Sequence, residues 1–202
     1  TLEKQMSVPL HAANEMAGSD EETVSKLKAI PAYVDLFDKA YGADSVTIEN
    51  MQSAIAAFER TLISNNSPFD KYAAGQFEAL TAQQRRGLNL FRSAATRCFE
   101  CHAAPTFGND NFFVTGVPDL AGQAHDAGRA AIANDGNDGA FKSPTLRNVA
   151  LFAPYMHNGT FATLEEVVDF YAKGGGADQG FKVDRQIVPF ELSAQEKEDL
   201  VA

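Results

Sequence analysis

The stretch from residue 103 to residue 160 limits the folds open to this chain more than any other feature. Glycine, proline, asparagine and aspartate recur there every few positions, and no long segment keeps the period of a helix or a strand. A loop region of this length is rare inside a compact domain unless it is functional or disordered. Its six aromatic residues argue against disorder: Phe107, Phe112, Phe113, Phe141, Phe152 and Tyr155. We therefore expect something other than secondary structure to organise this region.

Helical patterns flank the loop region on both sides. Thr47 to Ser64 carries an apolar stripe at helical spacing, and Pro31 to Ala40 is a second candidate that ends at Gly42. Capping patterns, in which a serine or threonine precedes a glutamate or glutamine by three residues, predict further helix starts. These starts are Ser19, Thr81, Thr163 and Ser193. The sequence therefore predicts an all-α chain with long loops.

Charge and hydropathy exclude two classes of function. The net charge of −10 argues against a phosphate-binding surface, so we expect no nucleic-acid partner and favour a basic or neutral protein partner. No apolar run approaches the roughly 20 residues that a membrane span needs. The chain begins with Thr1 and ends on a helical pattern, which we interpret as a processed or truncated piece of a longer protein.

Both cysteines of the chain lie in one motif, Cys98-Phe99-Glu100-Cys101-His102. C-x-x-C-H is the attachment pattern of c-type haem. Two thiols separated by two residues on a helical turn can reach the two vinyl groups of one porphyrin, and the next residue can present its imidazole to the iron. A thioredoxin-like dithiol would need a βαβ setting, and a zinc site would need two more ordered ligands. We therefore expect one covalent haem, which would also give residues 103 to 160 an apolar body to surround.

The residue on the other side of the iron is not decided by spacing. Five side chains could serve: Met51, His125, Met156, His157 and Tyr171. Met51 lies on an apolar stripe and is typical of a core residue, and His125 is typical of a solvated loop. Tyr171 shares a helix face with aliphatic residues, which is typical of a core aromatic whose hydroxyl finds a partner.

Longer motifs resemble one family. The C-x-x-C-H motif is followed by Gly128-Arg129, by the run from Phe141 to Val149 and by the run from Ala153 to Gly159; upstream lie Ala56 to Leu62 and Ser67 to Asp70. Together they resemble the bacterial diheme cytochrome c peroxidase and MauG family over nearly the whole chain. Members have two cytochrome c-like domains, each with a haem. The resemblance implies a helical linking region at 1–80, a cytochrome c-like haem domain at 81–202, and a first haem domain upstream of Thr1.

The resemblance also implies roles for individual residues. His102 is the expected proximal ligand of the electron-relay haem, and Tyr171 falls where the family places the distal ligand, which is Met in typical peroxidases and Tyr in MauG-like proteins. Gln5 and Glu15 align with residues on the distal side of the peroxide-reacting haem, where Glu15 would act as general acid-base.

Four further residues are predicted to bind either the haem propionates or a calcium ion. Arg129 and Arg147 are candidates to pair with haem propionates, because a guanidinium fork matches a carboxylate. The resemblance also implies a calcium ion on backbone carbonyls near Phe152 and Pro154.

Two functions follow as expectations. The first is the electron-transfer haem portion of a periplasmic peroxidase or MauG-like enzyme that uses hydrogen peroxide and a small electron donor, a cytochrome c or a cupredoxin, or a protein substrate. Two haems are then expected in the full protein, and the resemblance allows for a homodimer. The alternative is a monohaem cytochrome that only passes electrons.

Overall fold

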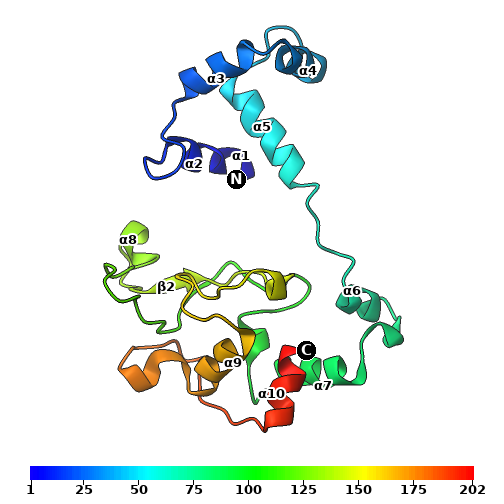
Figure 1. Ribbon diagram of the computed structural model, residues 1–202, viewed down its shortest axis with the longest axis vertical. Coiled ribbons are helices and arrows are strands. Elements are labelled where there is room, and N and C mark those ends of the chain that lie inside the picture. Colours follow the sequence, from blue (N-terminus) through cyan, green and yellow to red (C-terminus); the bar gives the residue numbers. More distant parts are fainter. The chain divides into compact units, whose positions relative to one another are not determined.

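The computed structural model describes all 202 residues and divides into two compact units, Thr1–Asn65 and Asn66–Ala202 (Figure 1). Helices predominate in both units, as the sequence predicts, and the strands form a single two-stranded sheet. The predicted division between residues 80 and 81 falls inside the second unit. None of the helices combines the length and the apolar character needed to span a bilayer.

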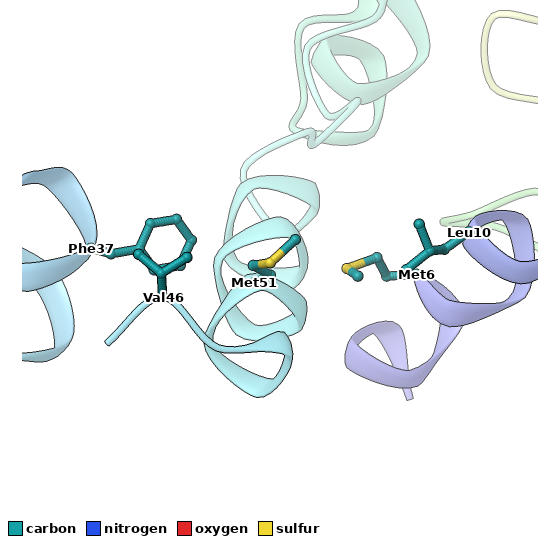
Figure 2. Packing of buried hydrophobic residues seen from close by; sticks show 5 residues of the cluster. All are labelled: Met6, Leu10, Phe37, Val46 and Met51. Atoms are coloured by element: carbon teal, nitrogen blue, oxygen red, sulfur yellow. The ribbon is translucent and has the colours of Figure 1, made fainter. Parts of the chain in front are cut away.

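The first unit contains five helices: α1 (Leu2–Gln5), α2 (Ser7–His11), α3 (Asp20–Lys28), α4 (Pro31–Tyr41) and α5 (Ile48–Glu59). Its core is formed by five buried side chains contributed by α2, α4 and α5 and the segments beside them (Figure 2); these are Met6, Leu10, Phe37, Val46 and Met51. The predicted signals at the helix ends are confirmed. Ser19 accepts a hydrogen bond from the backbone of Glu22, and α4 ends at Gly42, whose φ of 99° favours glycine.

Helix α5 is shorter than the predicted segment that ended at Ser64. It stops at Glu59, and the hydroxyl of Thr61 donates to the carbonyl of Phe58 in the final turn. Because a threonine hydroxyl that bonds the backbone competes with helix continuation, the chain leaves the helix there. Leu62, which the apolar stripe placed on the buried face, is 65% exposed.

The second unit combines short helical elements with one small sheet. The regular helices are α6 (Pro68–Ala73), α7 (Ala82–Phe91), α8 (Ala130–Ala133), α9 (Leu164–Ala172) and α10 (Ala194–Val201). Four 3-10 turns lie between them: η1 (Phe77–Ala79), η2 (Cys98–Glu100), η3 (Val149–Leu151) and η4 (Gly175–Gln179). The helix starts predicted at Thr81, Thr163 and Ser193 are confirmed, each with a complete capping box.

Helices α7 and α10 pack directly against each other (Figure 1). Arg86 of α7 forms a two-pronged ion pair with the buried Asp199 of α10, with N–O distances of 2.6 and 2.7 Å. Gly87 lies beside this pair, and a β-carbon placed on it would lie 1.8 Å from the carbonyl oxygen of Asp199. The absence of a side chain at Gly87 therefore allows the two helix backbones to approach closely.

We expect the substitution Gly87→Ala to lower the free energy of unfolding by about 3 kcal/mol, as overpacking of a core does. Helix propensity alone would favour alanine by about 1 kcal/mol, so the sign of the change separates the two effects. Urea denaturation followed by circular dichroism measures it. Asn89→Ala, at an exposed position of the same helix, is the control and should stay within about 0.5 kcal/mol. A stabilised Gly87→Ala variant would contradict this packing.

The loop region contains the sheet, which the sequence analysis did not predict. Strands β1 (Phe112–Val114) and β2 (Ala140–Lys142) pair antiparallel, with Phe113 opposite Phe141. Each strand has three residues, too few to show a period of two in the sequence. The pairing brings residues 109 to 114 against residues 140 to 143.

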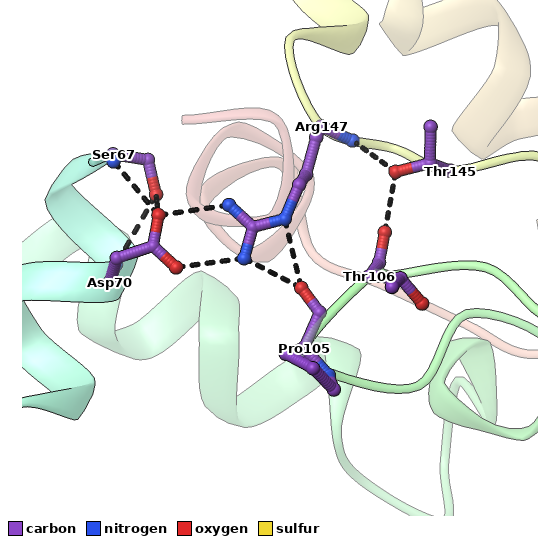
Figure 3. A network of polar contacts seen from close by, with 6 residues as sticks. All are labelled: Ser67, Asp70, Pro105, Thr106, Thr145 and Arg147. Carbon is purple, nitrogen blue, oxygen red and sulfur yellow. Dashed lines mark hydrogen bonds and ion pairs between the residues drawn. The ribbon is translucent and has the colours of Figure 1, made fainter. Parts of the chain in front are cut away.

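A polar network fastens the loop region to α6 (Figure 3). The guanidinium of Arg147 forms two ion-pair contacts with Asp70, at 2.7 and 2.8 Å, and also donates to the carbonyl of Pro105. Ser67 caps α6 and donates to the same carboxylate. The Arg147 guanidinium holds the pKa of Asp70 well below its usual range. Three segments far apart in the sequence are thus joined through one carboxylate.

Candidate haem site

The C-x-x-C-H segment forms a tight turn. Cys98 to Glu100 make the 3-10 turn η2, and the backbone N–H of His102 donates to the carbonyl of Cys98 at 3.0 Å. Arg97 precedes the turn in the left-handed region, with φ of 56°, and its guanidinium forms a two-pronged ion pair with Glu100. The two cysteines are half-buried and are not joined by a disulfide. This turn presents two separate thiols.

The imidazole of His102 is oriented by a backbone carbonyl. Its Nδ1 lies 2.9 Å from the carbonyl oxygen of Phe107, which can only accept, so Nδ1 carries the hydrogen. The lone pair therefore belongs to Nε2. Burial lowers the pKa of His102, which favours the neutral ring. A neutral imidazole whose Nδ1–H is held by a carbonyl is the usual arrangement of a histidine that binds a metal through Nε2.

The two thiols are not activated for redox exchange. Burial raises the pKa of Cys98, and burial raises that of Cys101 to about 11, with the negative charge of Glu100 adding to the effect. A reactive dithiol needs a lowered thiol pKa, so the electrostatics disfavour a thioredoxin-like function. The structure also contains no group of three or more His, Cys, Asp or Glu side chains placed to hold a metal ion, so it supplies no zinc set around these cysteines.

Tyr171 lies in the last turn of α9 and belongs to the same environment. Burial raises the pKa of its phenol, and negative charge on the thiols of Cys101 and Cys98 would raise it further. The phenol is therefore within electrostatic range of both thiols. Its ring packs edge-on against Phe170, with centroids 5.3 Å apart. Its role as the second axial ligand stays a prediction.

The other candidates have different surroundings. Met51 is buried in the core of the first unit. Met156 lies in a turn with φ of 70°, and the ring of His157 is stacked on Phe141 at 3.7 Å. Both nitrogens of the His125 ring are hydrogen-bonded to carboxylates. None of these contacts was visible in the sequence, because each depends on how the loops fold.

His125 joins the two ends of the loop that contains α8 through hydrogen bonds. Its Nδ1 lies 2.8 Å from Asp119 and its Nε2 lies 3.0 Å from Asp138, and these hydrogen bonds raise its pKa above the ordinary 6.5. Because folding raises the pKa of His125, its two hydrogen bonds stabilise the loop fully below pH 6.5. This stabilisation is lost as the pH rises through the raised pKa of the folded protein. Asp126 and His157 are further titratable groups beside this contact, and the backbone N–H of Asp126 donates to Asp119.

We therefore expect the loop from residue 118 to residue 139 to open more readily as the pH rises above 6.5. Hydrogen exchange of its backbone amides, corrected for the intrinsic pH dependence, measures the change. The variant His125→Gln should remove the dependence, while the exchange of helix α7 serves as an internal reference. Equal corrected protection at pH 6 and pH 9 in the unaltered protein would contradict this role for His125.

The remaining predicted residues either belong to the first unit or have partners within the second. Gln5 ends α1 and Glu15 lies in the turn after α2; both are exposed and belong to the first unit. Arg129 pairs with Asp135 at 2.6 Å and covers the ring of Phe112. The functional roles of these three residues stay predictions.

The predicted propionate partner Arg147 and the predicted calcium site near Phe152 and Pro154 lie between residues 147 and 154. Arg147 is bound by Asp70 and by the carbonyl of Pro105, so the guanidinium fork that we predicted for a propionate has a protein partner. Phe152 and Pro154 are exposed after η3. The propionate and calcium roles stay predictions.

Comparison with known proteins identifies the family. A family model described as di-haem cytochrome c peroxidase matches residues 1–78. The methylamine utilization protein MauG of Methylorubrum extorquens is 38% identical over 206 residues, which cover 100% of this chain and 56% of that protein. A solved MauG-like protein associated with microbial copper homeostasis superposes with a TM-score of 0.88 at 33% identity, over 99% of this chain and 66% of that one. The chain belongs to the di-haem cytochrome c peroxidase and MauG family.

A second curated relative in this family agrees with the first. The cytochrome-c peroxidase IdrP1 of Pseudomonas sp. strain SCT is 36% identical over 234 residues, covering 100% of this chain and 60% of that protein. The chain therefore spans somewhat more than half the length of these curated relatives.

Proposed function

We propose that this chain carries the electron-transfer haem of a periplasmic di-haem peroxidase or MauG-like oxidase. Cys98 and Cys101 would hold the haem through two thioethers, and His102 would bind its iron through Nε2. The observation that carries the proposal is the hydrogen bond from Nδ1 of His102 to the carbonyl of Phe107, because it leaves Nε2 as the only ring atom with a lone pair to give. The family's di-haem members support the same assignment.

The residues present suit such a haem. The thiols are half-buried, not joined to each other and separated by two residues, which suits attachment to the two vinyl groups of one porphyrin. When bound, the haem supplies one-electron oxidation and reduction. Tyr171 would offer a hard oxygen ligand, which favours the ferric state and a low potential. We therefore assign this chain a cytochrome c-like haem domain.

The first unit would contribute to chemistry on hydrogen peroxide. Reduction of peroxide to two waters consumes two electrons and two protons, so the site needs a group that can move protons. Glu15 is the proposed general acid-base, and Gln5 the proposed polar neighbour. Both side chains are exposed in this structure, and are thus accessible to groups outside this chain.

The electrons would come from a small redox protein, either a cytochrome c or a cupredoxin, or from a protein substrate that is oxidised. The net charge of −10 favours a partner with a basic surface. Two haems are expected in the full-length protein. The alternative is a monohaem relay cytochrome, which is favoured by the single C-x-x-C-H motif in these 202 residues.

Haem counting and peroxide reactivity separate these two functions. The full-length protein is reduced, its haem is counted as the pyridine haemochrome, and its oxidation by hydrogen peroxide is followed by absorbance. Two haems per polypeptide and fast oxidation support the enzyme, whereas one haem and slow oxidation identify the relay. Glu15→Gln should slow the oxidation by about 100-fold or more, and Glu21→Gln, another exposed carboxylate of the first unit, is the matched control.

A further inference from the structure

The carbonyl oxygen of Cys101 accepts hydrogen bonds from two side chains. The hydroxyl of Ser143 donates to it at 2.7 Å, and the amide nitrogen of Asn109 donates at 2.8 Å. Both donors come from the loop region, Ser143 from 42 residues away in the sequence. An exposed turn of the chain would satisfy this carbonyl with water. The peptide unit between Cys101 and His102 is instead fixed by the protein.

The two donors are themselves firmly placed. Ser143 directly follows β2 and is 6% exposed, and its backbone N–H donates to the carbonyl of Asn111 at 3.0 Å. The backbone N–H of Asn109 donates to the carbonyl of Ser143 at 3.3 Å. These bonds extend the pairing of β1 with β2 up to the cysteine motif. The small sheet therefore determines the position of both donors.

The fixed carbonyl lies next to the imidazole. It belongs to the peptide bond that begins His102, so its direction sets the direction in which the side chain of His102 leaves the backbone. The hydroxyl oxygen of Ser143 also lies 3.5 Å from Nδ1 of His102, the atom that donates to Phe107. Loss of the Ser143 hydroxyl would release the peptide and widen the space beside Nδ1 at the same time.

We propose that Ser143 and Asn109 are positioning residues for His102, and that they keep its Nδ1–H on the carbonyl of Phe107. This inference rests on the proposed function, because it assumes a haem on Cys98 and Cys101. A strong hydrogen bond at Nδ1 makes the imidazole a more basic ligand, which stabilises ferric iron and lowers the reduction potential. Ser143 would thus influence the iron through the peptide and the ring of His102.

The test compares variants of the haem-loaded, full-length protein. Ser143→Ala should raise the reduction potential of this haem, and the Nδ1–H proton of His102 should exchange with solvent about tenfold faster, since one lost hydrogen bond corresponds to about 1.4 kcal/mol. Ser143→Thr, which keeps the hydroxyl, should restore both values. Ser93→Ala removes a bond of the same 2.7 Å length, from the hydroxyl to the carbonyl of Leu90, and should change neither.

A second variant covers the case in which Ser143→Ala does not fold. Asn109→Ala removes the other bond to the Cys101 carbonyl and should change the potential and the exchange rate in the same direction. Haem attachment is checked on every variant by the pyridine haemochrome. Absence of covalent haem from the unaltered protein refutes the proposed function, whereas attached haem with an unchanged potential and exchange rate in both variants refutes this inference alone.

Discussion

The double substitution of Cys98 and Cys101 by alanine is expected to abolish covalent haem in this chain. The structure contains no other cysteine, so no second thiol could replace either attachment. A porphyrin held only by His102 would dissociate on denaturation, because a coordinate bond to iron does not survive unfolding of the site that positions it. Denaturing mass spectrometry of the purified chain measures the loss directly.

The control for this substitution keeps both thiols. Phe99 lies between the two cysteines and is 40% exposed, so Phe99→Leu changes the motif without removing an attachment point. This variant should retain the full complement of haem. A double cysteine variant that still carries covalent haem on residues 1 to 202 would contradict the assignment, as would a Phe99→Leu variant that folds but carries none.

Tyr171→Phe is expected to change the ferric absorption spectrum and to raise the reduction potential by on the order of 0.1 V, within the ~0.8 V range that axial ligands span. The substitution removes one oxygen and preserves the ring, so the packing against Phe170 is kept. A hard oxygen ligand stabilises ferric iron, and its loss therefore favours the ferrous state. Spectroelectrochemical titration measures the potential.

Tyr155→Phe is the matched control for this prediction. Tyr155 is also half-buried and belongs to the loop region, where its backbone pairs with that of Phe161. Removal of its hydroxyl should leave the spectrum and the potential of the haem unchanged. A Tyr171→Phe protein with the spectrum of the unaltered protein would remove this tyrosine from the coordination of the iron.

Much of the helical structure could be predicted because its signals are local. Capping boxes at Thr81, Thr163 and Ser193 each involve residues three positions apart, and the structure contains all three. Packing between helices was not predictable in the same way. Gly87 gave no signal in the sequence beyond its presence inside a helix, yet its contact with Asp199 decides how closely two helices approach.

The site was only partly predictable for the same physical reason. The cysteine motif and His102 are contiguous, so their spacing alone indicates the chemistry. Ser143 and Asn109 act on the Cys101 carbonyl through bonds that exist only once β1 and β2 have paired. Their surrounding sequence, rich in small polar residues, is typical of any loop.

The sequence indicated the kind of partner that Arg147 binds, but not which residue provides it. A guanidinium fork does match a carboxylate, as predicted, and in the structure it pairs with Asp70 of α6. The sequence indicates that such a residue will find an anion, and only the fold shows which one lies within reach. Asp70 is 77 residues away along the chain.

The central claim is that one haem is covalently attached to Cys98 and Cys101. The most direct test is proteolysis of the purified, correctly matured protein, followed by mass spectrometry of the peptide that contains both cysteines. This peptide is expected to carry the mass of one haem, with neither thiol open to alkylation. A peptide of unmodified mass, with both thiols alkylated, would contradict it.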